Sequence, residues 1–478
     1  MPNPNGALRA LAREGLSVER DGNLVRVRSL KQPDGLPAEV LLPADHPLDS
    51  KALKQLVGFA QVRHPAGGQV LQAFATPDFH PGSVVPVGCV LATSEIVIPA
   101  AIGTDINCGM RLHVADLSVD ELLARKPEWL KALKGDLLMS TRDLPMDVPQ
   151  IRAMFRSGPF GWLEEVERRP LGLLARADLR QLQDELNRSF DLGSLEGDED
   201  YAPIDMMPDD RDVVRDCFIG TIGGGNHFVE LQVVEEVLDR QWAFQWGVRK
   251  GQVAVMAHSG SRRVGIIVGQ SWMQAAKDRW PVGVAHPDIF SLHGEAAASY
   301  VRAMNTAANY AAVNRLLLVE MVRDRLRQCF PGLELPLVFD APHNIVTEVS
   351  PQRAMGQEGR LYIHRKGATP ARFGQPVLIP GSMDQASYLM VGLGSERFLQ
   401  SASHGAGRKL SRRDMHRLDK TGADLGLDSI ECVTLKSERL VQEAPAAYKE
   451  IGSVVQVQAD AGIATPVARL RPLLTFKG

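Results

Sequence analysis

The sequence predicts a mixed α/β protein of the α+β class, in which a single large domain has a β-sheet core and a helical insertion. Three observations predict this class. Short apolar runs broken by glycine and proline recur in both halves of the chain, a long middle segment has helical spacing, and polar motifs follow strand-like runs directly. The 478 residues are 44% hydrophobic and 23% charged, which is typical of a globular protein.

The N-terminal segment 1–65 is expected to be rich in β-strands. Residues 22–42 alternate apolar and polar side chains around turn residues, which is the pattern of short strands with one buried face. Between residues 68 and 114 the apolar runs VVPVGCVLA and IVIPAAI are broken by glycine and proline. These runs predict buried strands joined by tight loops.

The middle of the chain favours helices. Residues 118–215 contain leucine, alanine, arginine and glutamate at helical spacing and predict a helical insertion, whereas residues 295–328 form the longest helical pattern. From residue 336 onward, strand-like runs return. We find no internal repeat and no linker composition, so one domain over residues 1–478 is the expected organisation.

The overall charge excludes a protein that coats nucleic acid indiscriminately, because the formal net charge is -3. Phosphate binding would therefore be local. No apolar stretch approaches the roughly 18 residues of a membrane helix, and the first residues do not resemble a signal peptide, so we expect a cytoplasmic protein. The five cysteines are odd in number and widely spaced, which favours a reducing compartment and leaves one of them available as a working thiolate.

The first motif with chemical potential is GTDINCG, where Asp105 and Cys108 lie three residues apart in a loop after an apolar run. Both side chains can bind a metal. A thiolate combined with a carboxylate favours borderline or soft divalent ions, and one sulfur can bridge two of them. A buried cysteine in a turn is the alternative interpretation of this segment.

Three histidines lie next to strand-like runs: His258 follows VAVM, His343 follows LPLVF, and His227 follows three glycines and precedes an apolar-polar alternation. One such histidine would usually be an ordinary hydrogen-bonded residue. Three of them, together with Asp105 and Cys108, indicate five ligands that can hold two ions if the cysteine bridges. Manganese and zinc both fit this ligand set.

His404 lies in the small-residue loop SHGAGR, which ends in Arg408. Exposed amides in such a loop can bind an anion, a neutral imidazole can attack phosphorus, and Arg408 can clamp a phosphate. A glycine-rich turn with an incidental histidine is the alternative. We further predict anion or nucleotide contacts from the patch HRKGAT at residues 364–369, which begins with the cationic run His364–Lys366, and from the turn at residues 379–383, which contains Ser382.

With these residues laid out, the chain resembles the RtcB family of RNA ligases, which join RNA ends using GTP and manganese. The resemblance covers essentially the whole length, through the segments PDFH, GTDINCGMR, GTIGGGNHFVE, HSGSR, HRKGAT, LIPGSM, SHGAGR, EAPAAYK and VARLRPLLTFKG. It implies an RtcB-like catalytic domain over residues 1–478. Two manganese ions would be held by Asp105, Cys108, His227, His258 and His343.

The resemblance also implies that His404 becomes guanylylated, with Arg408 beside it and Asp78 orienting its ring. The implied contacts to the guanine nucleotide and its phosphates are Asn226, Glu230, Ser382, Gly405, Ala406, Gly407 and Lys477. GMP would pass from His404 to an RNA 3′-phosphate, formed from a 2′,3′-cyclic phosphate where necessary. A 5′-hydroxyl would then displace GMP, in tRNA splicing or RNA repair. An archease-type activator is a further partner that the resemblance suggests.

Three positions depart from the usual pattern of these motifs. Arg263 and Asp384 each stand where glycine usually follows HSGSR and GSM, and Pro370 stands where arginine usually follows HRKGAT. Two other classes of function compete with RNA ligation. A binuclear phosphohydrolase would use the same five ligands without needing His404, and an RNA-binding module would keep the residues without turnover.

Overall fold

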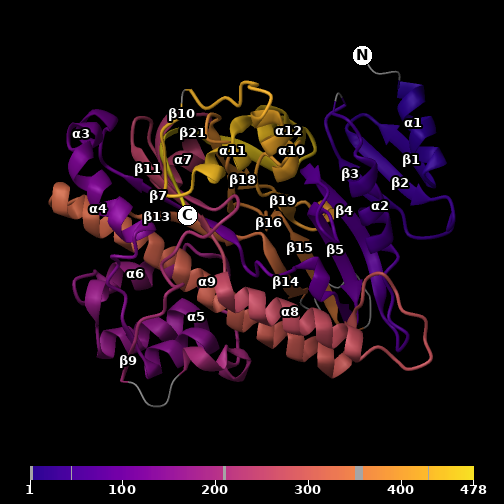
Figure 1. Ribbon diagram of the computed structural model, residues 1–478, viewed down its shortest axis with the longest axis horizontal. Helices are drawn as coiled ribbons and strands as arrows, with labels where there is room; N and C mark the ends of the chain where they lie inside the picture. The colour runs from indigo at the N-terminus through magenta and orange to yellow at the C-terminus, as the bar shows by residue number, and fades with distance from the viewer. Residues whose placement is uncertain (1–3, 45, 208–211, 350–358, 429) are drawn as a thin grey trace.

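The computed structural model describes residues 4–44, 46–207, 212–349, 359–428 and 430–478, and its described part is a mixed α/β domain with two large sheets (Figure 1). In Figure 1 the sheet that contains the N-terminal strands lies at one side, and the helices α3 to α6 lie at the other. The first sheet has the order β1 (Leu16–Asp21), β2 (Leu24–Ser29), β3 (Ala38–Leu41), β4 (Gln69–His80), β5 (Val87–Ser94), β15 (Leu361–Lys366) and β14 (Asn344–Val349).

The second sheet has the order β13 (Leu337–Pro342), β7 (Gly109–Ala115), β11 (Val253–Ser259), β10 (Phe228–Val237), β21 (Ala464–Lys477), β18 (Ser387–Gly392) and β17 (Pro376–Ile379), with β20 (Cys432–Thr434) paired to β21. Its neighbouring strands are antiparallel except for β20 and β21. Short pairs are formed by β6 (Ile96–Val97) with β12 (Leu292–His293), β16 (Ala368–Pro370) with β19 (Ser401–Ser403), and β8 (Met146–Asp147) with β9 (Val213–Val214).

The helices are α1 (Pro4–Arg13), α2 (Ser50–Ala60), α3 (Val119–Ala124), α4 (Lys126–Leu138), α5 (Val148–Arg168), α6 (Leu179–Leu186), α7 (Arg240–Trp246), α8 (Arg262–Asp278), α9 (Gly294–Cys329), α10 (Arg412–Asp419), α11 (Ser437–Gln442) and α12 (Ile451–Asp460). No helix in the described ranges combines the length and apolar character needed to cross a membrane.

The long helix α9 organises the largest hydrophobic core. It spans 36 residues and contacts α4, α5, α8 and β11, so that nearly all its residues from Ala303 to Arg323 are buried. Figure 1 shows it running diagonally across the molecule, from α4 near one end to α8 near the other. Burying a leucine such as Leu317 contributes about 1.5–3 kcal/mol to the stability of this core.

The N-terminal segment is less purely β than the sequence pattern suggests. The alternation at residues 22–42 corresponds to β2 and β3, but α1 and α2 lie in the same segment. The Asp49 side chain accepts a hydrogen bond from the Ala52 amide and caps α2, whose buried face contains Leu53, Leu56 and Val57. The helices α3 to α6 fall within residues 118–215, where we predicted a helical insertion.

Candidate active site

Four neighbouring strands of the second sheet bring the predicted metal ligands together, because the ends of these strands that carry the ligands lie side by side. Cys108 immediately precedes β7, and the register pairs Gly109, the first residue of β7, with Pro342 of β13 and Ser259 of β11. His343 therefore follows β13 at the same edge. His258 pairs with Phe228, the first residue of β10, so that His227 also lies there. Antiparallel register thus gathers side chains from distant parts of the chain.

The ligand atoms lie close enough together to share cations. The Cys108 Sγ atom is 3.1 Å from Nε2 of His227 and 3.1 Å from Nε2 of His258. His258 and His343 approach to 3.3 Å between their Nε2 atoms, and Asp105 Oδ2 is 3.0 Å from His227 Nε2. The five residues form two overlapping groups, Cys108 with His258 and His343, and Asp105 with Cys108 and His227.

The chemistry of these donors fits a metal. Burial lowers the pKa values of His258 and His343 well below the usual range, so both rings are neutral and offer lone pairs. His227 bonds through Nδ1 to the Ile222 carbonyl at 3.1 Å, which assigns the proton to Nδ1 and leaves Nε2 for a cation. Burial and the nearby Asp105 raise the pKa of the Cys108 thiol, a group that a bound metal ion would deprotonate.

His404 stands beside this cluster, directly after β19. Its ring centroid is 4.7 Å from that of His343, and its Nδ1 atom is 2.5 Å from Asp78 Oδ2. Asp78 is fully buried in β4 and also accepts hydrogen bonds from the His404 amide and the Thr76 hydroxyl. Although burial raises the pKa of Asp78, His404 and Thr76 lower it below the ordinary value, so Asp78 is a carboxylate that holds the proton on Nδ1.

The loop after His404 packs tightly on the strand that carries Asp78. A Cβ atom on Gly407 would come within 2.2 Å of the Asp78 carbonyl oxygen, and the φ angle of Gly407 is +74°. Both facts require glycine at this position. Gly223 also has a positive φ angle, +94°, which favours glycine there.

One pocket of about 460 Å³ joins the metal-ligand cluster to the predicted nucleotide contacts. It is lined by Asp105, Cys108, His258, His343, His404, Gly405, Ala406, Gly407, Arg408, Asn226, Glu230, Ser382 and Lys477. Asp78 and His227 stand behind this lining and touch it through His404 and through Asp105 and Cys108. The structure therefore brings together the expected metal ligands, His404 with Asp78 and Arg408, and the expected nucleotide contacts.

The C-terminal strand β21 completes one wall of the pocket. Glu230 on β10 pairs in register with Thr475 on β21, whose hydroxyl donates a hydrogen bond to the Glu230 carboxylate, and burial raises the pKa of Glu230. Lys477 lies above the Phe228 ring, with its Nζ atom 5.9 Å from the ring centroid. Its cation is buried near the carboxylates of Glu230 and Glu443.

Arg408 is held by an acidic partner that sequence reasoning missed. Its Nη1 atom is 2.9 Å from Oε2 of Glu443, and its guanidinium lies 5.2 Å from the Tyr448 ring centroid. Arg412 also pairs with Glu443 and lines the pocket. Glu443 and Tyr448 occur in the segment EAPAAYK, to which we assigned no role, and Arg412 lies in the basic run after the His404 loop.

The predicted cationic run at residues 364–366 is only partly correct. His364 is buried and accepts a hydrogen bond from the Ile98 amide at 3.0 Å. Arg365 is also buried and donates to Ser401, Thr347 and the Leu399 carbonyl. His364 and Arg365 thus form hydrogen bonds with neighbouring strands and loops inside the protein. Of the three residues, only Lys366 lines the pocket.

Comparisons with known proteins agree with this geometry. The family model described as "tRNA-splicing ligase RtcB" matches residues 55–478. The "tRNA-splicing ligase RtcB" of Thermococcus kodakarensis is 32% identical over 442 residues, which cover 84% of this chain and 86% of that protein. The "RNA-splicing ligase RtcB" of Mycobacterium tuberculosis is 34% identical over 442 residues, covering 86% and 98%. The protein of Archaeoglobus fulgidus with the same description as the first is 32% identical over 473 residues, covering 90% and 92%.

Proposed function

The chain belongs to the RtcB family of tRNA-splicing ligases, and on this premise we propose that it is an RNA ligase with a guanylylated histidine. Its substrates are RNA ends with a 3′-phosphate or a 2′,3′-cyclic phosphate and RNA ends with a 5′-hydroxyl. GTP is the co-substrate and manganese the metal. We also propose a cytoplasmic location and an archease-type activator as a partner.

The observation that carries this proposal is the position of His404. A hydrolase needs only the ligand cluster, whereas here a buried carboxylate, Asp78, fixes the proton on Nδ1 of a histidine that lines the same pocket. This arrangement leaves Nε2 as the nucleophilic nitrogen. Because a metal-ligand cluster and an oriented imidazole occur in the same pocket, nucleotidyl transfer is favoured over simple hydrolysis.

In the proposed first step, Nε2 of His404 attacks the α-phosphorus of GTP, an N–P bond forms, and the bond to pyrophosphate breaks. The ring gains positive charge, which the Asp78 carboxylate stabilises through Nδ1–H. When bound, two divalent cations would neutralise charge on the phosphoryl oxygens. Lys366 and Arg412 line the same pocket and add positive charge near these oxygens.

In the second step, an oxygen of the RNA 3′-phosphate attacks the same phosphorus, the N–P bond breaks, and neutral His404 is regenerated. The product is RNA-3′-pp-5′-G. In the third step, the 5′-hydroxyl attacks the RNA 3′-phosphorus, loses its proton, and displaces GMP to form the 3′,5′-phosphodiester. Activation precedes sealing because a phosphate monoester has no adequate leaving group until GMP is attached.

An assay of end chemistry tests this function directly. With manganese and GTP, we expect an RNA strand with 5′-hydroxyl and 3′-phosphate ends to be circularised, and a strand with 5′-phosphate and 3′-hydroxyl ends to remain linear. Release of inorganic phosphate from the first strand without sealing would favour the phosphohydrolase. Binding of the strand without any product would favour an RNA-binding module.

Replacing Asp78 by asparagine is expected to slow guanylylation of His404 by about a hundredfold to ten-thousandfold. The amide keeps the size of the side chain but cannot stabilise the developing charge on the ring or enforce the Nδ1–H tautomer. Because Asp78 lies behind His404 and not against the nucleotide, the KM for GTP should change less than about threefold. A raised KM with an unchanged guanylylation rate would contradict this positioning role.

Replacing Asp384 by glycine is expected to tighten GTP binding. The Asp384 carboxylate accepts the hydrogen bond of the Ser382 hydroxyl, which competes with donation from Ser382 to a nucleotide, and its charge opposes the anionic ligand. One such hydrogen bond corresponds to about 1 kcal/mol, or roughly a fivefold lower KM for GTP with kcat unchanged.

The matched variant Asp384→Asn separates the two effects of Asp384. It removes the charge but keeps an oxygen that can accept from Ser382, so it should recover only part of the gain. Steady-state kinetics with GTP as the varied substrate measure both variants. An unchanged or raised KM in Asp384→Gly would show that Asp384 does not restrain the nucleotide site.

A further inference from the structure

Two consecutive residues in the middle of α9 face the segments that carry the metal ligands. Asn314 and Arg315 are buried, with 0% and 2% of their surface exposed, in a stretch of the helix that is otherwise mostly apolar. Asparagine is a weak helix former, and a buried guanidinium is costly unless it is fully paired. Both side chains therefore need specific partners, and the structure identifies them.

Arg315 forms hydrogen bonds with three of the four segments that carry the metal ligands, which we call the ligand segments. Its Nη1 atom donates to the Asn107 carbonyl at 2.6 Å and to the Ser259 carbonyl at 3.3 Å. Its Nε and Nη2 atoms donate to Asp340 Oδ1 at 2.9 and 2.8 Å. Asn107 lies between Asp105 and Cys108, Ser259 follows His258, and Asp340 precedes His343 by three residues.

Asn314 connects the fourth ligand segment. Its Nδ2 atom donates to Ser259 Oγ at 2.9 Å and to the carbonyls of Thr221 and Gly260 at 3.2 Å, and its Oδ1 accepts from the Thr221 amide at 3.1 Å. Ser259 in turn donates to the Ile222 carbonyl, which is the partner of His227 Nδ1. The loop before His227 is thereby fixed to the turn after His258.

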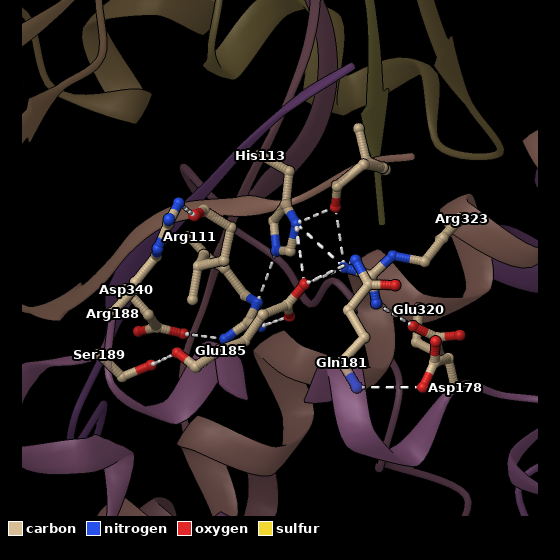
Figure 2. A network of polar contacts seen from close by, with 12 residues as sticks. Arg111, His113, Asp178, Gln181, Glu185, Arg188, Ser189, Glu320, Arg323 and Asp340 are labelled. Carbon is tan, nitrogen blue, oxygen red and sulfur yellow. Dashed lines mark hydrogen bonds and ion pairs between the residues drawn. The ribbon is translucent and has the colours of Figure 1, made fainter. Parts of the chain in front are cut away.

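The charge of Arg315 is balanced inside the protein. The other oxygen of Asp340 bonds to Arg111, which bonds to Glu185 of α6, and Glu185 pairs with Arg323 (Figure 2). Arg323 also pairs with Glu320, so three arginines face three carboxylates. His113 lies among them as a neutral ring, since burial lowers its pKa well below the usual range.

Neither Asn314 nor Arg315 belongs to the set of described residues that line the pocket. With its charge matched by Asp340 and its donors directed at backbone carbonyls, Arg315 is not placed to bind a substrate phosphate. What the two side chains share is that every hydrogen bond they make joins segments on which Asp105, Cys108, His227, His258 and His343 depend.

We propose that Asn314 and Arg315 are positioning residues of the metal centre, which set the distances between its four ligand segments. The inference rests on the proposed function only in that the cluster binds divalent cations. Groups that orient metal ligands typically affect metal affinity by about 10-fold to 100-fold when they are lost. A lysine at position 315 keeps the charge but cannot bond all three segments from one planar group.

The test compares Arg315→Lys with Arg323→Lys in the full-length protein. Arg323 is equally buried, lies two turns further along α9, and belongs to the same ionic network, but it bonds to none of the four ligand segments. Manganese affinity is measured without GTP or RNA from the electron paramagnetic resonance signal of the free ion. We expect about 10-fold to 100-fold weaker binding for Arg315→Lys and less than about threefold for Arg323→Lys.

A neutral substitution keeps the inference testable if Arg315→Lys does not fold. Asn314→Ala leaves no charge unpaired, and we expect it to weaken manganese binding and to alter the absorption spectrum of the cobalt-substituted protein. Wild-type affinity in a folded Arg315→Lys or Asn314→Ala protein would overturn the proposal, as would equal losses in Arg323→Lys. Because these measurements omit GTP and RNA, failure of the ligase function alone would leave them unchanged.

Discussion

Alanine in place of His404 is expected to abolish RNA sealing, with a loss of at least about a thousandfold in rate. The substitution removes the only protein atom that we propose to bond to GMP, and neither Asp78 nor Lys366 can replace it in that geometry. The strand with 5′-hydroxyl and 3′-phosphate ends is the substrate, and circular product is measured with GTP and manganese.

The same variant should keep its metals. The ring of His404 lies beside His343 but is not a member of either ligand group, so manganese binding to His404→Ala should stay near the wild-type value. His416→Ala is the matched control, because that histidine bonds to Gln442 and does not line the pocket. Sealing by His404→Ala at even a tenth of the wild-type rate would contradict a guanylylated His404.

Replacing Cys108 by serine is expected to have the second largest effect, because Cys108 is the one member that both ligand groups share. A serine hydroxyl is a much weaker donor than a thiolate for manganese or zinc, and it does not bridge two ions as readily. We expect the bound manganese to fall to less than one ion per chain and sealing to fall by at least about a thousandfold.

His343→Ala provides the comparison for Cys108→Ser, since His343 belongs to one group only. It should lose one ion and retain the other, as measured by metal content after dialysis. Cys217→Ser is the control, because that cysteine is exposed and belongs to neither ligand group. Retention of two ions by Cys108→Ser would exclude the shared thiolate.

Much of the site was predictable because four of the five ligands follow strand-like runs, whereas His227 follows three glycines. The sequence places Asp105, Cys108, His258 and His343 at strand ends, but it does not say which strands are neighbours. The structure shows which strands are neighbours. The antiparallel register of β13, β7, β11 and β10 places those strand ends side by side. The resemblance to the RtcB family implied the same five ligands, because their motifs match those of the family.

Other parts of the site escape sequence reasoning for physical reasons. The pairing of Arg408 with Glu443 joins residues 35 positions apart, and charge patterning reports only neighbours on one element. Arg365 looks like an exposed cation in the sequence, yet its guanidinium donates a hydrogen bond to the Leu399 carbonyl inside the protein. For Asn314 and Arg315, the period of α9 predicts burial but says nothing about which loops lie opposite.

The helices α1 and α2 show the same limit at the level of the fold. The β-like alternation of residues 22–42 dominates the pattern of the N-terminal segment, and α2 is only 11 residues long. Short helices depend on tertiary packing and on caps such as Asp49 more than on composition. Their prediction therefore requires knowledge of the sheet against which they pack.

Following GMP through the reaction tests the guanylylation of His404 most directly. The wild-type protein is incubated with manganese and GTP labelled at the α-phosphate, separated from free nucleotide, and then mixed with unlabelled RNA that bears a 3′-phosphate. We expect acid-labile label on His404 that passes to the RNA 3′ end and leaves as GMP upon sealing. Sealing of the RNA by a protein that never carries the label would contradict this expectation.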